Sequence, residues 1–455
     1  MLSKKLLVNL LFIFGFSFWG FGNWVTAEIS EVVGYSISAF PYLLMFAFFL
    51  LDFIHRSKYA GRNHIKVTTN GFYWVVIFFI ATAIVARMIG LTHGVPNLTF
   101  KAAAAFSVMA LIPFHGFIVL HYYNHDDPDF DFLDLFFKGM LVLWFINVLG
   151  WGAGFTNSNH YIPGRVNFPF TGGIYEGGNI MLVVALFAFY RMLDFRKTQP
   201  YYFAGYALLL LVDTLMFMKV NSRLSTILVG LIILLAMIRA LRAYNFWYIT
   251  TWFLLPGLMS FGNLVYYILS HPVFASVMQR VNKKDITTFN GRSYLWESGL
   301  NWMFEDRTGL LFGNGFNGGG YLKLYQKVIK MWNVKDPWVL HSHSALIEIT
   351  VDQGLVGIIS FGVIIYLTGK YYRNRLDESN SHKAAYLSFF LIFALLQIDT
   401  FVVPGGWGYI LMLALASPVV IKAVPVRRKK NRFSTQKIDR LAQYATVGKE
   451  KNAVG

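Results

Sequence analysis

The chain has 455 residues, of which 56% are hydrophobic and only 14% are charged, and it contains no cysteine. A soluble globular domain is about half apolar and a quarter charged, so this composition argues against a soluble enzyme. The lack of cysteine excludes disulfides, thiolate chemistry and zinc sites with cysteine ligands. The net charge of +17 gathers in short segments between apolar runs. That distribution favours membrane topology over nucleic-acid binding, so we expect no nucleic-acid partner.

The apolar residues form runs of seventeen or more, long enough to cross about 30 Å of hydrocarbon as helices. They do not alternate in polarity as the strands of a membrane β-barrel do. Because a backbone in lipid must satisfy its own hydrogen bonds, helices remain as the spanning structure. The sequence therefore predicts an all-α polytopic membrane protein that contacts membrane lipids. We expect about twelve transmembrane helices near 6–24, 35–54, 71–90, 101–122, 133–154, 176–192, 201–219, 224–240, 246–268, 345–369, 384–400 and 407–424.

The distribution of lysine and arginine predicts the orientation of these spans. The first run, 6–24, lacks a convincing signal-peptidase site, so we interpret it as a span and not as a cleaved signal. Segments on the same side as the N-terminus hold 25 of the 40 basic residues, whereas the short loops opposite hold four. Since short basic loops stay in the cytoplasm, both termini are expected to be cytoplasmic.

One hydrophilic segment, 269–342, is too long to be a simple connection and falls on the outer side. It contains a glycine cluster and an amphipathic helix around Leu295–Phe304. We expect it to fold over the outer face as a lid or a catalytic subdomain. The predicted organisation is 1–268, spans one to nine; 269–342, the outer loop subdomain; 343–424, spans ten to twelve; and 425–455, a basic cytoplasmic tail attracted to anionic lipid.

Two short patterns in this region are better explained as structural than as cofactor sites. Residues 313–318 read G-N-G-F-N-G, but without a βαβ unit they indicate turn glycines and not a dinucleotide site. His341 and His343 are two residues apart, with Glu348 and Asp352 following, and this is not a recognisable zinc signature. We expect neither a metal nor another cofactor.

Three arginines lie at the expected outer boundary: Arg165, Arg223 and Arg292. Arginine binds phosphate through two parallel hydrogen bonds and keeps its charge. Each could also be an interfacial side chain with its charged end in water. If the three converge on one cavity, they would hold a pyrophosphate.

The residues that follow the outer segment carry a resemblance to a known family. His343-Ser344 is followed by nine residues and then by Gly354-Leu-Val-Gly357, with Asp352 two positions before the first glycine. This resembles the signature of the O-antigen ligase and polymerase superfamily, in which His precedes Asn, Ser or Gln and G-x-x-G follows. Ser344 stands where asparagine is commoner.

Three further patterns occur in the order found in that family. Gly291-Arg292-Ser-Tyr-Leu-Trp296 precedes Leu311-Phe-Gly313-Asn-Gly315 in the outer segment. Asn221-Ser-Arg223-Leu-Ser-Thr resembles the family's Ser-Arg pattern at the start of a span. Gly164-Arg165-Val-Asn-Phe resembles its arginine-bearing outer loop. The resemblance is strong across 200–370 and weak elsewhere.

The resemblance implies a metal-independent glycosyltransferase of the bacterial inner membrane whose site faces the periplasm. The donor would be a glycan on undecaprenyl pyrophosphate, and the acceptor either lipid A-core, for a ligase, or a growing glycan, for a polymerase. His343 would be the catalytic base, because histidine can take a proton from the acceptor hydroxyl near neutral pH. Arg165, Arg223 and Arg292 would bind the pyrophosphate, whose growing charge needs fixed cations. The supporting residues would be His341, Ser344, Asp352, Gly354 and Gly357.

A twelve-helix secondary transporter is the alternative from another functional class. Arg87, His115, Lys138 and Asp213 lie within apolar runs, where we expect them to be buried, and they could form a proton path or structural pairs. Carriers of this kind have two similar six-span halves, which this sequence lacks, and its largest loop lies between spans nine and ten.

Overall fold

The computed structural model describes residues 3–59, 67–157, 166–171, 174–220, 291–334, 336, 338, 340–398 and 406–423, with isolated positions at 245, 248–252, 254, 267 and 271. Within these residues, eight helices are long and apolar enough to cross a membrane. Ten of the twelve expected spans coincide with described helices. The other two, 224–240 and 246–268, and the tail 425–455 lie wholly or largely outside the described residues. The ten are α1 (Lys4–Glu28), α2 (Glu31–Tyr59), α3 (Phe72–Thr92), α4 (Phe100–Asn124), α5 (Phe132–Gly152), α6 (Ile174–Phe195), α7 (Pro200–Val220), α15 (Ala345–Arg373), α16 (Asn380–Ile398) and α17 (Trp407–Val420).

Short polar side chains begin several of these helices. The Ser3 hydroxyl accepts from the Leu6 N–H at the start of α1, and the Thr99 hydroxyl accepts from Ala102 at the start of α4. Each cap satisfies one of the N–H groups that a helix leaves without an internal partner.

Burial separates central from peripheral helices. In the spanning windows of α6 and α15, 67% of residues are buried, against 11% for α7. Glycine lets α1 and α2 approach closely, since a Cβ on Gly22 would lie 2.5 Å from the Gly34 carbonyl oxygen. Small residues serve this purpose in membranes, where packing and not water exclusion drives helix association. α15 is therefore a central element of the bundle.

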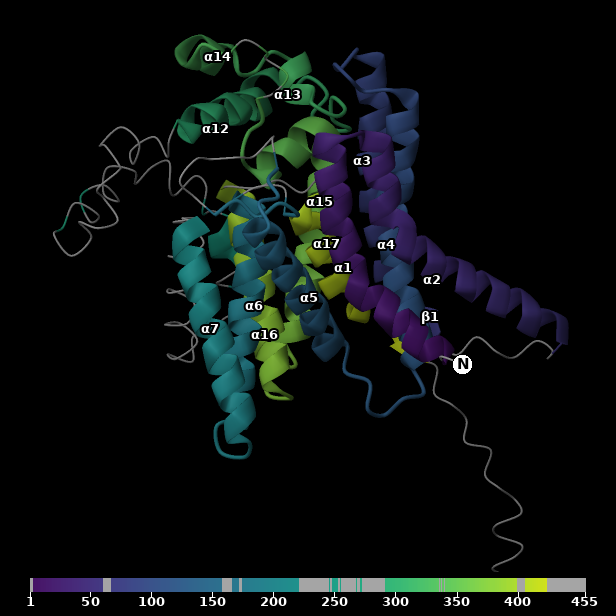
Figure 1. Ribbon diagram of the computed structural model, residues 1–455. Coiled ribbons are helices and arrows are strands. Elements are labelled where there is room, and N and C mark those ends of the chain that lie inside the picture. The colour runs from purple at the N-terminus through teal and green to yellow at the C-terminus, as the bar shows by residue number, and fades with distance from the viewer. Residues whose placement is uncertain are drawn as a thin grey trace, which may run out of the picture.

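The described part of the outer segment forms three short helices, and an irregular stretch, 340–344, then leads into α15. They are α12 (Arg292–Asn301), which a π-helical turn, Trp302–Asp306, extends, α13 (Gly318–Tyr321) and α14 (Gln326–Trp332). α12 confirms the helix expected around 295–304 and buries Leu295, Trp296 and Gly299. Figure 1 shows α12, α13 and α14 together at the end of the bundle opposite the N-terminus. We call that end the outer end, and the other the inner end.

A small sheet at the inner end departs from the all-α expectation. β1 (Val67–Thr69) pairs antiparallel with β2 (Ile421–Ala423), with Thr68 opposite Lys422 (Figure 1). It joins the connection between α2 and α3 to the segment after α17. Its six residues were too few and too far apart in sequence to be predicted as a pair.

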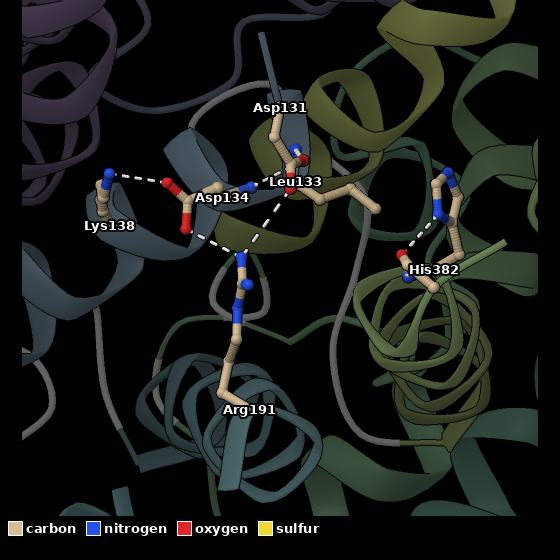
Figure 2. A network of polar contacts seen from close by, with 7 residues as sticks. Asp131, Leu133, Asp134, Lys138, Arg191 and His382 are labelled. Atoms are coloured by element: carbon tan, nitrogen blue, oxygen red, sulfur yellow. Dashed lines mark hydrogen bonds and ion pairs between the residues drawn. The ribbon is translucent and has the colours of Figure 1, made fainter. Parts of the chain in front are cut away.

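Side-chain ion pairs also hold the inner end, as Figure 2 shows. The Arg191 guanidinium in α6 lies 2.8 Å from Asp134 and 3.8 Å from Asp131, both at the start of α5. Lys138 contacts the other Asp134 oxygen at 2.6 Å. Asp131 also caps α5, accepting from the N–H groups of Leu133 and Asp134.

Candidate functional site

The site is built around a break in α15. Gly354 has φ 71° and ψ −169°, which interrupts the helix inside the run predicted as one continuous span. Only glycine adopts this backbone conformation readily. A Cβ at this position would also lie 2.4 Å from the Leu311 carbonyl oxygen. The G-x-x-G motif thus begins at a position where a side chain can hardly be accommodated.

The 313–315 loop of the outer segment fills this break with backbone hydrogen bonds. The N–H groups of Asn314 and Gly315 donate to the carbonyls of Val351 and Asp352 at 2.8 and 3.0 Å. Gly313 and Gly315 have φ values of 83° and 79°, which confirms them as turn glycines.

The part of α15 after the break donates hydrogen bonds to the residues just before this loop. The N–H groups of Leu355 and Val356 donate to the carbonyls of Leu310 and Leu311 at 2.8 and 3.3 Å. The backbone groups that the break frees are therefore satisfied from the loop, as buried polar groups require. The glycine turn at 313–315 and the G-x-x-G motif that begins at Gly354 are therefore joined by backbone hydrogen bonds.

Asp352 fixes the start of α13 from within this break. Its carboxylate accepts from the N–H of Gly318 at 2.9 Å and of Asn317 at 3.3 Å, and the residue is buried. The aspartate of the motif is thus engaged by backbone donors. We interpret it as a positioning group for the outer segment.

His343 lies in the irregular stretch before α15, and its backbone is left-handed, with φ 52°. Its ring centroid is 4.2 Å from that of His341, and both side chains are half-buried. A non-glycine residue in this region is uncommon, and such positions gather at functional sites. The fully buried Ser344 occupies the N-cap position of α15 without a capping side-chain hydrogen bond.

Ser342, between the two histidines, holds this stretch in place. Its N–H and hydroxyl lie 2.9 and 2.7 Å from a Glu348 carboxylate oxygen. Its carbonyl accepts from the Trp296 indole N–H at 3.0 Å. Glu348, considered above as a metal ligand, is thus a structural partner of Ser342. Among the described residues, no three His, Cys, Asp or Glu side chains form a group that could hold a metal ion.

The Trp296 contact also places α12 beside the histidines. Arg292 is the first residue of α12, half-buried, and lies four positions before Trp296. Residues four apart share a helix face, so Arg292 is on the face of α12 that contacts the His341–His343 stretch.

Arg165 and Arg223 lie outside the described residues, but their neighbours meet. The N–H of Val166, directly after Arg165, donates to the carbonyl of Lys219 at 3.3 Å. Lys219 is four residues before Arg223. Val166 is therefore in contact with the end of α7.

Arg87, which we had considered only as a charge within a span, also contacts the outer segment. Its guanidinium carbon lies 3.9 Å from the Phe316 ring centre, and its Nη2 lies 3.4 Å from a Glu31 oxygen. The Phe316 N–H donates to the Ala86 carbonyl at 2.6 Å. α3 thus holds the residues next to the 313–315 loop, and no local sequence signal announces this long-range contact.

A buried tyrosine completes the packing of the outer segment. Tyr325 is buried, and its ring lies against Gly319, where a Cβ would come within 2.7 Å of it. Burial, and secondly the nearby carboxylates of Glu348 and Asp352, raise the pKa of the Tyr325 phenol well above its usual range. The phenol therefore stays neutral and packs as part of the small core.

The proton path of the transporter alternative fits these positions poorly. Lys138 is not buried but 56% exposed, and it pairs with Asp134 at the inner end. That part of the prediction is wrong. Arg87 contacts the outer segment, and His115 lies 3.1 Å from the Tyr73 hydroxyl. Asp213 is buried in α7.

Comparison with known proteins gives one distant relative. Over 121 residues the chain is 26% identical to a protein of Rickettsia felis named "Putative polysaccharide ligase". The match covers 24% of this chain and spans 29% of the length of that relative. No family model matches the chain. The long apolar helices are those of a multi-pass membrane protein.

Proposed function

We propose that this protein is a membrane glycosyltransferase of the O-antigen ligase type. It transfers a glycan from undecaprenyl pyrophosphate to lipid A-core at the periplasmic face of the bacterial inner membrane. The observation that carries the proposal is the placement of His343. Its side chain is half-buried and its backbone is left-handed. It precedes the broken central helix α15 and lies beside α12, which begins with Arg292.

The reaction requires one base and one set of cations. The acceptor hydroxyl attacks the anomeric carbon of the donor glycan and gives its proton to the His343 imidazole. The bond from that carbon to the pyrophosphate oxygen breaks, and its electrons leave with the pyrophosphate. Arg292, with Arg165 and Arg223, stabilises the charge that develops there. No metal and no cofactor takes part.

A polymerase that extends a lipid-linked glycan is the second candidate. The histidine and glycine motifs of 343–357 resemble both activities, and the bond chemistry is the same. Only the acceptor differs, so an acceptor series separates the two.

The test uses purified protein in lipid vesicles with an undecaprenyl pyrophosphate-linked glycan. Lipid A-core and a second lipid-linked repeat unit are offered in separate reactions, and products are resolved on gels. We expect transfer to lipid A-core that a chelator does not reduce. Transfer to the repeat unit alone would make the protein a polymerase. Activity lost on chelation and restored by a divalent ion would overturn the metal-independent mechanism.

A further inference from the structure

Large apolar side chains are exposed where the outer segment meets α15. Leu311 and Phe312 are 54% and 72% exposed, and Leu355 and Ile359 on α15 are 38% and 63% exposed. Leu355 and Ile359 are four residues apart, so they share one face of the helix. We call these four residues the apolar rim. Exposed apolar side chains beside a spanning helix favour contact with lipid or with an apolar ligand.

The backbone holds the two halves of the rim together. The Val356 N–H donates to the Leu311 carbonyl at 3.3 Å, and the Leu355 N–H donates to the Leu310 carbonyl at 2.8 Å. Phe312 therefore lies beside the first turn of α15 after the break. The rim is a fixed feature of both elements and not the tip of an isolated loop.

Helix length places the rim relative to the membrane. At 1.5 Å per residue, the stretch from Gly354 to Arg373 is about 28 Å long, close to the thickness of the hydrocarbon layer. Lys370 and Arg373 mark its inner end. The break, and with it Phe312, therefore falls at the opposite boundary of the hydrocarbon.

The residues before the rim limit how deeply it can enter lipid. Glu305, Asp306 and Arg307 are exposed and charged, and they precede Leu311 by only a few positions. Charged groups remain at the headgroup level, whereas aromatic and aliphatic groups enter the acyl boundary. The arrangement suits shallow insertion of the rim alone.

We propose that the apolar rim is inserted into the outer leaflet, and that the isoprenoid chain of the donor leaves the bilayer there. The second part rests on the proposed function. Ile359 also lines a groove of about 460 Å³ that continues inward along α15 between Trp252 and Tyr366. In the other direction, twelve positions along the chain and the break at Gly354 separate Leu355 from His343. The pyrophosphate and the first isoprene units would occupy that interval.

Insertion is tested with spin labels, because a chain without cysteine accepts a single label at a chosen position. Phe312→Cys is compared with Lys330→Cys, an exposed position on α14. The protein is placed in vesicles of phosphatidylethanolamine and phosphatidylglycerol. We expect the label at 312 to be more accessible to oxygen than to a water-soluble nickel chelate, and the label at 330 to show the reverse. Preference for the nickel chelate at 312 would overturn insertion.

The entry role is tested with Phe312→Asp and two donors, one with an undecaprenyl chain in vesicles and one with a soluble geranyl chain. Transfer from the undecaprenyl donor should fall roughly tenfold to a hundredfold, the range for losing the burial of one phenylalanine. Transfer from the geranyl donor should not change. Met331→Asp, on exposed α14, is the matched control and should change neither. Equal loss with both donors would overturn the entry role. Absence of transfer by the unaltered protein would overturn the proposed function but leave the spin-label result standing.

Discussion

The two ends of the bundle are held by different kinds of contact. At the outer end, the break at Gly354 is filled by backbone hydrogen bonds from residues 310–315. At the inner end, besides the short β1–β2 pairing, side-chain ion pairs such as Arg191 with Asp134 connect the helices (Figure 2). Backbone contacts at positive φ depend on glycine, whereas an ion pair in water contributes little and has many substitutes.

We infer that the outer end must keep one backbone geometry, whereas the inner end must only keep its charge. The outer contacts position His343 and α12, where small displacements would change reactivity. The inner contacts lie among basic residues whose number, more than their pairing, orients the helices. The five predictions below test this contrast.

Sidedness gives the largest expected effect, because it is all-or-none. A reporter inserted at residue 325, in the outer segment, should signal the periplasm, as should one at 285. Reporters at 60, 378 and 440 should signal the cytoplasm. A cytoplasmic signal from residue 325 would exclude a site that uses donors presented outside.

Substitution of His343 should have the largest effect on rate. His343→Ala should lose about two to four orders of magnitude in transfer, the contribution of a positioned general base. Binding of the lipid-linked donor should persist, because the arginines hold the pyrophosphate. The rate in the unaltered protein should fall in acid, as the imidazole takes up a proton and no longer accepts one.

His341→Ala is the matched control for that experiment, since its ring lies 4.2 Å from that of His343. It should lose less activity than His343→Ala. Full turnover by His343→Ala would make the histidine structural.

Substitution of the arginines should have the next largest effect on the transfer rate. Arg292→Ala and Arg223→Ala should each lose roughly two to three orders of magnitude in rate while membrane insertion is unchanged. Arg→Lys should restore only part of the loss, since lysine lacks the planar fork. Arg307→Ala, an exposed arginine in the same outer segment, is the control. Near-normal turnover in Arg223→Ala would show that Arg223 is only an interfacial anchor.

Gly354→Ala should destabilise the outer end. The alanine would adopt a backbone conformation that costs about 1–3 kcal/mol, and its Cβ would press on the Leu311 carbonyl. Thermal unfolding in detergent should shift downward, and protease should cut the outer segment faster. Gly205→Ala in α7 is the control, because a Cβ there meets nothing within 4 Å. Equal behaviour of the two variants would mean that the break is not required.

Much of the fold could be predicted from apolar runs and basic loops, because both are local. The break in α15 could not, since the run 345–369 reads as one span and nothing local marks Gly354 as a non-helical position in it. The Arg87–Phe316 and Trp296–Ser342 contacts join residues 229 and 46 positions apart, and only the folded chain brings them together.

The candidate site could be predicted in part for the same reason. The motif identified the positions of His343 and Gly354 along the chain. It did not reveal that Ser342, a small residue without a distinctive pattern, holds the stretch with the two histidines in place through Glu348. The roles of His343, Arg292 and Arg223 remain predictions that the experiments above test.

The smallest effect is expected at the inner end. Arg191→Ala removes contacts to Asp134 and Asp131, whose side chains are 32% and 52% exposed. Because solvent screens such pairs, the free energy of unfolding should fall by about 1 kcal/mol or less. A double-mutant cycle with Asp134→Asn should give a coupling energy in the same range, since Lys138 also shares that carboxylate. Transfer activity should not change. A coupling energy well above this range would mean that the inner end also depends on one fixed geometry, and the contrast between the two ends would fail.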